Sequence, residues 1–254
     1  MNILIPLPDN DFDVTEVSVP WRLLSDKGYD VIFATEKGQT PRGDPRLLSG
    51  VIFGQLGAEP EPRRFYRELE RAAPFRNPIA WDAVNPHDYA GLILPGGHAP
   101  GMRQYLGSGV LREKAAEFWS LERPVGAICH GVLVLARAKD PASNRSLIHD
   151  RDTTCLPKYM ERSAHMLTRW KLGTYYRTYP EFVEDEVKRA LDNPAAQFKR
   201  GPINLTRKGT RVDDRAAFVV QDRRYLSARW PGDAYLFAER FATLLSGSAI
   251  HAVQ

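Results

Sequence analysis

The amino-acid sequence predicts an α/β fold in which a mostly parallel sheet carries helices on both faces. The chain opens with an apolar strand, an amphipathic helix and a second apolar strand, over residues 2–34. A β-α-β start of this kind is typical of parallel sheets, because parallel neighbours need a crossover connection. Residues 89–94 and 125–128 are short, continuous apolar runs, as expected of strands that are buried on both faces.

Length and composition favour one globular domain over residues 1–254. The chain has 254 residues, of which 43% are hydrophobic, so a substantial core can form. No internal repeat, low-complexity linker or composition shift marks a second domain. The net charge of +4 comes from 35 basic and 31 acidic residues, and this modest excess does not indicate a nucleic-acid partner.

The spacing of the cysteines and the first residues of the chain predict the cellular compartment of the protein. Cys129 and Cys155 are the two cysteines, and their spacing suggests neither a disulfide framework nor a zinc site. We therefore expect a reducing compartment, the cytoplasm, and neither a metal ion nor a cofactor. The chain enters its first strand without a basic, cleavable leader, and no run reaches the ~18 apolar residues of a membrane span. No membrane partner is expected.

Capping and turn residues set the element boundaries in the first half. Thr15 is a candidate N-cap of the first helix, and Gly28 ends that helix. Proline and glycine mark the loops that follow. The expected elements are strands over residues 2–7 and 29–34, a helix over 15–27, a loop over 35–49, a strand-like segment over 50–57, a helix over 62–72 and a loop over 74–88.

The second half continues the alternation and ends in a hairpin and a helix. Asp233 is a candidate N-cap of the last helix. Cys155 lies within an expected strand with no histidine beside it, so we expect a structural role for it. The expected elements are strands over residues 89–94, 125–128, 152–156, 216–220 and 225–228, and helices over 110–121, 131–138 and 234–245.

Residues 158–200 form an expected helical insertion, with helices over 159–172 and 181–191. Tyrosines and arginines are interleaved through it, and a basic and aromatic surface can bind single-stranded nucleic acid. The helical spacing and the acidic run over residues 181–186 favour a lid or a subunit interface instead.

Cys129 and His130 stand where the buried strand over residues 125–128 meets the next helix. Small neighbours such as Gly131 allow a sharp turn that presents the cysteine side chain, which is the logic of a nucleophile elbow. The helix N-terminus behind the sulfur favours a thiolate. The alternative is a cysteine that serves as a small hydrophobic residue of the core.

Two further segments lead to the same sheet edge. Gly96, Gly97 and His98 follow the strand over residues 89–94, and a diglycine there can aim backbone N–H groups at an oxyanion or substrate. Glu16 falls in the first turn of the first helix, beside the carboxyl end of the first strand. A carboxylate that complements the helix dipole is the alternative for Glu16, and a structural histidine is the alternative for His98.

These residues resemble the ThiJ/PfpI superfamily. Four blocks carry the resemblance: Glu16 four residues before Pro20, the strand and loop YAGLILPGGH, the elbow GAICHG, and YLSARWPGD before the last helix. The loop EKGQTPRGDP resembles the larger branch of the superfamily, which includes chaperone-like proteins and cofactor-independent glyoxalases. The resemblance implies a flavodoxin-like, doubly wound fold related to class I glutamine amidotransferase domains, and commonly a homodimer.

The resemblance also implies roles for the site residues. Cys129 would be the nucleophile, Glu16 its hydrogen-bonded carboxyl group and His130 an acid or base, with oxyanion donors from Gly97 and the backbone of His130. The implied function is a cysteine-dependent enzyme acting on a small carbonyl or amide compound, either glyoxalase-like, converting methylglyoxal to lactate, or a hydrolase. The alternative is a redox sensor or holdase chaperone of the stress response, with Cys129 oxidised to a sulfinate.

One departure from the family pattern concerns the third member of a triad. Several relatives carry an acid soon after the strand that follows the elbow, and this chain has Lys158 there, with Glu161 as the nearest acid. The change argues against peptide hydrolysis more than against aldehyde chemistry. Residues 227–233 also lack the His-x-Glu pair of amidotransferases, so glutaminase function is not expected.

Overall fold

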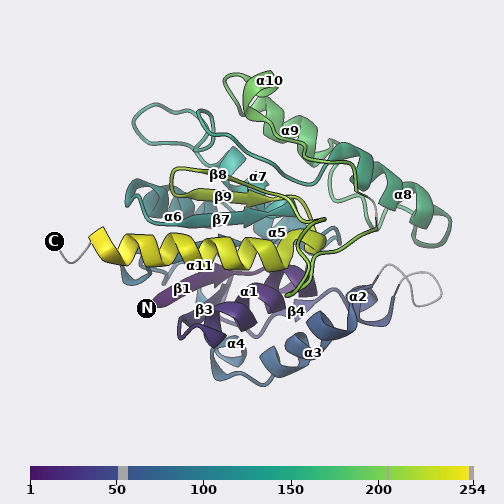
Figure 1. Cartoon of the computed structure of the whole chain (residues 1–254), viewed down its shortest axis with the longest axis horizontal. Coiled ribbons are helices and arrows are strands. Elements are labelled where there is room, and N and C mark those ends of the chain that lie inside the picture. Colours follow the sequence, from purple (N-terminus) through teal and green to yellow (C-terminus); the bar gives the residue numbers. More distant parts are fainter. Residues whose placement is uncertain (51–56, 205, 252–254) are drawn as a thin grey trace.

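The fold is a seven-stranded sheet between two helical layers, which confirms the predicted α/β class (Figure 1). The computed structural model describes residues 1–50, 57–204 and 206–251. The strands run in the order β5-β3-β1-β6-β7-β9-β8, and every neighbouring pair is parallel except β8 and β9. The strands are β1 (Asn2–Pro6), β3 (Asp30–Thr35), β5 (Ile79–Ala80), β6 (Gly91–Leu94), β7 (Val125–Ile128), β8 (Val219–Asp222) and β9 (Tyr225–Ala228).

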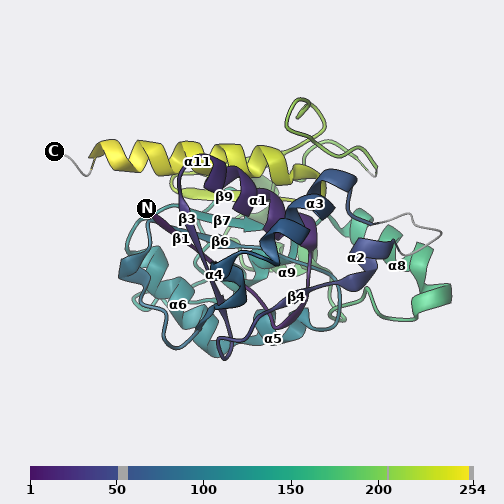
Figure 2. The same ribbon diagram turned by 90° about the horizontal axis from the view of Figure 1, so that it is seen from below.

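One layer contains α1 (Val14–Asp26), α3 (Pro60–Leu69) and the long α11 (Ala234–His251). In Figure 2, α11 extends along the whole sheet beside α1. Its approach depends on a strand position without a side chain, since a Cβ at Gly126 would lie 2.6 Å from the Phe237 ring. The sheet can therefore receive aromatic residues of α11 directly against its backbone.

The other layer contains α5 (Met102–Gly107), α6 (Gly109–Ser120) and α7 (Val132–Arg137). The two central strands β6 and β7 lack polar side chains and are buried at every position. This burial on both faces explains why their sequences do not alternate between apolar and polar residues.

The predicted helical insertion holds α8 (Lys158–Leu172), α9 (Val183–Arg189) and the short α10 (Pro194–Gln197). In Figure 1, α8 lies near α2 (Pro45–Ser49), at the end of the molecule opposite the two chain termini. Hydrogen bonds tie the segment to the sheet edge: Tyr176 donates to Asp44 (3.0 Å), and Thr178 donates to the carbonyl oxygen of His98 (2.7 Å). The segment therefore lies beside the loop that carries His98.

Several aromatic and basic residues of this segment have partners within the protein. Besides Tyr176, Arg177 pairs with Glu161 (3.2 Å), and Tyr159 donates to the carbonyl oxygen of Asn204 (3.4 Å). Trp170 donates to the Leu167 carbonyl oxygen at 3.0 Å and is 70% exposed.

The predicted strand over residues 152–156 is wrong. Thr153 forms an isolated bridge with Phe198, and the Thr154 N–H donates to the Ser227 side chain at 3.0 Å. The physical reason is competition for one edge: β8 pairs with β9 through a tight hairpin, and a local hairpin closes at less entropic cost than a distant segment. Cys155 is buried there with a free thiol.

Several loops contain short elements that the sequence patterns did not predict. These are β2 (Asn10–Phe12), β4 (Arg42–Gly43), α2, α4 (Ala73–Arg76), the 3-10 helix η1 (Pro86–Asp88), β5 and α5. The strand-like segment expected over residues 50–57 falls almost entirely on residues 51–56, which lie outside the described ranges.

Two predicted caps are wrong. Asp13, not Thr15, caps α1, because its side chain accepts hydrogen bonds from the N–H groups of Thr15 and Glu16. Asp233 lies within the 3-10 helix η3 (Pro231–Asp233), and its carboxylate binds the fully buried Arg229 guanidinium at 2.9 Å and the Phe218 N–H. Asp13 is the cap because it directly precedes the first helical residue, Val14, whereas the carboxylate of Asp233 is already bound by Arg229 and Phe218.

Candidate active site

Cys129 occupies a strained turn between β7 and α7. Its φ angle is 58°, in the left-handed region that non-glycine residues rarely adopt. The 3-10 helix η2 (Cys129–Gly131) makes the turn, and it passes so close to β6 that a Cβ at Gly131 would lie 2.0 Å from the Leu94 carbonyl oxygen. The structure thus contains the predicted elbow, with the cysteine at its tip.

Glu16 reaches the same point from the first turn of α1. Its Oε2 accepts a hydrogen bond from the Gly96 N–H at 2.8 Å, and its carboxyl group interacts with the Cys129 thiol. Its Oε1 is buried and has no hydrogen-bond partner within the described ranges. The carboxyl group and the sulfur are thus neighbours that shift each other's pKa, and the hydrogen bond expected between them stays a prediction.

Burial controls the protonation of this pair. Removal from water raises the pKa of the Glu16 carboxyl group well above its usual range, and the neighbouring Asp13 carboxylate raises it further. Burial also raises the pKa of the Cys129 thiol, as does the Glu16 carboxylate. Both shifts favour the protonated forms of the two groups, so the buried site favours the thiol over the thiolate that the helix N-terminus alone would favour.

Two histidines complete the cluster. The Sγ atom of Cys129 lies 3.5 Å from Nδ1 of His130, and the rings of His130 and His98 are 4.8 Å apart, edge to face. Burial lowers the pKa of His98 to about 4 and lowers that of His130 well below its usual value. Both imidazoles are therefore neutral at pH 7 and can accept a proton or bind an electrophile.

The two glycines of the loop after β6 differ in whether their backbone N–H groups are already hydrogen-bonded. The Gly96 N–H is occupied by Glu16, so it is not available to an oxyanion. The Gly97 N–H forms no hydrogen bond within the described part of the chain. A Cβ at Gly96 would lie 2.7 Å from the His130 nitrogen, which shows how closely the loop and the elbow approach.

A cavity of about 330 Å³ reaches this cluster at His98, whereas Glu16, Cys129 and His130 are buried and do not line it. His98, Asp13 and Thr15 line it on the side of the sheet, and Ala164 and Thr168 of α8 line it on the side of the insertion. Its volume suits a small organic molecule. The predicted lid segment thus contributes wall residues to the cavity.

Trp230 also lines this cavity, although the sequence patterns marked it only as part of the block YLSARWPGD and gave it no role at the site. Its indole Nε1–H is buried with no hydrogen-bond partner among the residues described. The strand pairing explains its position: Ala228 pairs with Ile128 in parallel register, so the residues that follow β9 and β7 emerge at the same sheet edge. The rule that ligands bind at the carboxyl ends of parallel strands could have identified it.

Neither Lys158, which stands where relatives carry an acid, nor Glu161, the nearest acid, is hydrogen-bonded to His130. Lys158 donates to Asp185 at 2.6 Å. The Glu161 carboxylate accepts from Arg177 at 3.2 Å and from the Val183 N–H at 3.0 Å. Glu161 therefore links α8 to residues 177–183 within the insertion. The described residues contain no acid hydrogen-bonded to the His130 ring.

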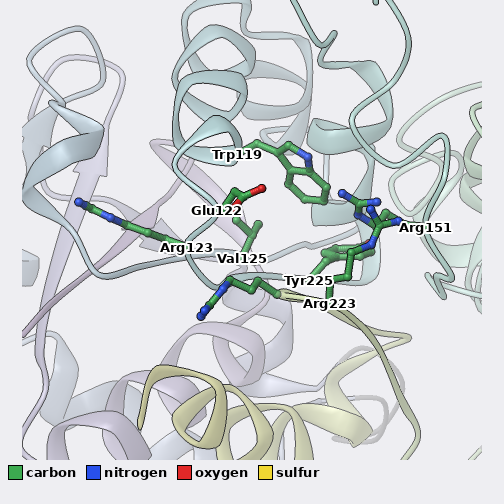
Figure 3. A pocket seen from close by; sticks show the side chains of 8 residues that line it. Trp119, Glu122, Arg123, Val125, Arg151, Arg223 and Tyr225 are labelled. Atoms are coloured by element: carbon green, nitrogen blue, oxygen red, sulfur yellow. The ribbon is translucent and has the colours of Figure 1, made fainter. Parts of the chain in front are cut away.

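A second cavity, of about 280 Å³, lies at the opposite edge of the sheet, where β7 and β9 begin (Figure 3). Trp119 and Tyr225 line it with several arginines, among them Arg151 and Arg223. These two guanidinium groups share the Asp150 carboxylate. No residue of the Cys129 cluster lines this cavity, so we place the candidate active site at the other edge.

The fold and the cluster together define a class: doubly wound α/β proteins with a cysteine at a nucleophile elbow and a carboxyl group beside it. The family model described as ThiJ/PfpI family-like matches residues 7–202. The chain belongs to this family, as the resemblance of its motifs implied.

Relatives and solved structures agree with this assignment. A deglycase of Pyrococcus abyssi is 25% identical over 249 residues, which span 96% of this chain and 99% of that protein. The deglycase PfpI of Pyrococcus furiosus is 29% identical over 142 residues, 54% of this chain and 66% of that protein. The structure of glyoxalase III from Candida albicans superposes with a TM-score of 0.68 at 19% identity, covering 96% and 97% of the two chains. At that identity the superposition supports the fold alone. Among the described residues, no helix is both long and apolar enough to span a membrane.

Proposed function

We propose that this protein is a cysteine-dependent enzyme acting on small carbonyl compounds, with a glyoxalase-like conversion of methylglyoxal to lactate as the reaction. The observation that carries the proposal is the position of Cys129, strained at the elbow, with its Sγ atom 3.5 Å from Nδ1 of His130 and with buried Glu16 near enough to shift its pKa. The adjoining cavity provides room for the substrate.

The first step is addition of the thiol to the aldehyde carbon. The Sγ–C bond forms, the carbonyl electron pair moves to oxygen, and the oxygen takes the thiol proton, which gives a hemithioacetal. The Gly97 N–H, which has no partner in the described chain, is the donor we assign to the developing oxyanion.

The second step moves a proton between adjacent carbons. A base removes the proton of the sulfur-bearing carbon while the ketone oxygen gains a proton, which gives an enediol. The former ketone carbon then receives a proton and the hydroxyl on the sulfur-bearing carbon loses one, so the hemithioacetal becomes a thioester. Hydrolysis of the thioester by water releases lactate and the thiol. Glu16, with its unpartnered Oε1, and neutral His130 are the groups we assign to these transfers.

This reaction fits the site better than peptide or amide hydrolysis. A hydrolase of the triad type orients its histidine with an acid, and no such acid contacts His130 within the described ranges. The names of the relatives, deglycase and glyoxalase III, point to carbonyl chemistry in the family. They support the proposal at the level of reaction type.

A redox sensor is the second candidate function. The Cys129 thiol loses its proton and its sulfur attacks peroxide, that proton leaves with the released oxygen as water, and a sulfenic acid forms. A second peroxide oxidises the sulfenic acid to the sulfinate, with release of water and a proton. A protonated Glu16, which its raised pKa favours, would donate a hydrogen bond to that anion. Selective gain of two oxygens at Cys129 under mild peroxide, without methylglyoxal turnover, would support this candidate.

The decisive test is lactate formation from methylglyoxal by the wild type and by Cys129→Ala. We expect the substitution to reduce kcat by about 10³-fold or more, as for loss of a nucleophile. Cys155→Ala is the matched control, because Cys155 is equally buried but lies away from the cluster, and it should retain turnover. Turnover that persists in Cys129→Ala would exclude the proposed nucleophile.

A further inference from the structure

Three side chains that bind transition metals converge at the candidate site. His98, Cys129 and His130 each offer one ligand atom, and these atoms all lie within 4.8 Å of one another. His98 comes from the loop after β6, and the other two residues come from the elbow after β7. Since β6 and β7 are adjacent and parallel, the sheet itself brings the three residues together.

The separations suit tetrahedral coordination. Zinc binds thiolate sulfur at about 2.3 Å and imidazole nitrogen at about 2.0–2.1 Å, so neighbouring ligand atoms in a tetrahedral site lie roughly 3.3–3.7 Å apart. The distance of 3.5 Å between Sγ of Cys129 and Nδ1 of His130 already falls in that range. Closing the remaining separations requires a shift of about 1 Å in the His98 side chain, which borders the cavity.

The unpartnered nitrogen of His98 and the types of donor atom both favour metal binding. Nε2 of His98 is buried and has no hydrogen-bond partner in the part of the chain that the structure describes. A buried imidazole nitrogen without a partner costs free energy, and metal coordination would relieve that cost. Soft thiolate and imidazole donors select zinc-like or cuprous ions over magnesium and calcium, which require oxygen ligands.

We propose that His98, Cys129 and His130 form a binding site for Zn²⁺ and similar thiophilic cations, with the fourth position open to water from the cavity. On binding, the Cys129 thiol loses its proton to solvent and the sulfur bonds to the metal, while the two neutral histidines contribute lone pairs. The coordinated sulfur is no longer free to attack a carbonyl carbon. Zinc therefore inhibits the reaction, and this consequence rests on the proposed function, whereas the binding itself does not.

Cobalt(II) provides a direct test, because it replaces zinc and reports on its ligands. We expect one equivalent of Co²⁺ to give a thiolate-to-cobalt charge-transfer band together with the intense visible bands of tetrahedral cobalt, and Zn²⁺ to displace it. Cys129→Ser should abolish the charge-transfer band. His98→Ala should weaken binding at least about tenfold, since loss of even an outer-shell partner costs roughly 10- to 100-fold in affinity. Circular dichroism of each variant establishes that it is folded.

Cys155→Ala is the matched control and should leave the cobalt spectrum unchanged. No thiolate band in the folded wild type, a band that survives Cys129→Ser, or unchanged affinity in His98→Ala would each overturn the proposal. The spectra need no substrate, so they separate the two proposals: a cobalt site in a protein without methylglyoxal turnover would refute the reaction and keep the metal site. In an active enzyme, added Zn²⁺ should inhibit and a chelator should restore turnover.

Discussion

The carboxylate of Glu16 accepts a 2.8 Å hydrogen bond from the backbone N–H of Gly96. This bond ties the first helix to the loop after β6, at the point where that loop passes the elbow. It aims the acid at Cys129, and it also removes the Gly96 N–H from the set of oxyanion donors. One contact thus fixes both the acid and the choice of Gly97 as the donor in the proposed reaction.

Glu16→Gln should separate the positioning of this side chain from proton transfer. Glutamine keeps an oxygen for the Gly96 N–H but cannot carry the proton. We expect kcat for methylglyoxal to fall by about 10²- to 10⁴-fold, while the thermal midpoint stays near that of the wild type. Steady-state kinetics with a melting curve check both. Undiminished kcat would remove Glu16 from the proton-transfer steps.

Trp230→Phe tests whether the indole N–H contacts the substrate. The substitution keeps an aromatic wall but deletes a buried donor that has no partner among the described residues. Loss of one hydrogen bond should raise KM by about 3- to 10-fold, with a smaller effect on kcat. Trp119→Phe is the control, because Trp119 lines the cavity at the opposite sheet edge. Equal effects of the two changes would refute a specific contact.

Gly131→Ala should destabilise the elbow. The new Cβ would lie 2.0 Å from the Leu94 carbonyl oxygen, and backbone cannot yield as a flexible side chain can. We expect a loss of at least about 2 kcal/mol in the free energy of unfolding, measured by urea denaturation. Gly107→Ala is the control, because a Cβ at Gly107 would have no neighbouring atom within 4 Å, and it should change this free energy by less than about 1 kcal/mol. Similar values for both would contradict the close packing at Gly131.

Glu161 should make the stability of the wild type depend on pH. Burial raises the pKa of this carboxyl group to about 7 from an ordinary value of 4.5. The folded state therefore holds a proton that the unfolded state releases, and the contribution of Glu161 to stability falls as pH rises through this window. Relative to Glu161→Gln, the wild type should lose roughly 1–3 kcal/mol between pH of about 4.5 and about 7.5. Urea denaturation at both pH values measures this, and a constant difference would contradict the shift.

Much of the fold follows from local sequence patterns. The strands β6 and β7 are apolar runs that can be satisfied only between two helical layers, and both lie where the sequence predicts them. The elbow could also be predicted, because Cys129 directly follows the last residue of the strand over residues 125–128. By contrast, residues 152–156 carry a strand-like pattern but no strand, because a hairpin closer in sequence occupies the edge of β9.

The sequence by itself determined that a cysteine, a histidine, a diglycine and an acid all belong to one edge of a parallel sheet, since each stands at the end of a strand or the start of a helix. Only the tertiary structure decided how these groups divide their contacts. It assigned the Gly96 N–H to Glu16, directed Glu161 to Arg177 and Val183, and brought His98 and Trp230 to the same cavity. The physical reason is that hydrogen-bond partners and burial depend on distances between strands and loops far apart in the chain, which the spacing of residues does not encode.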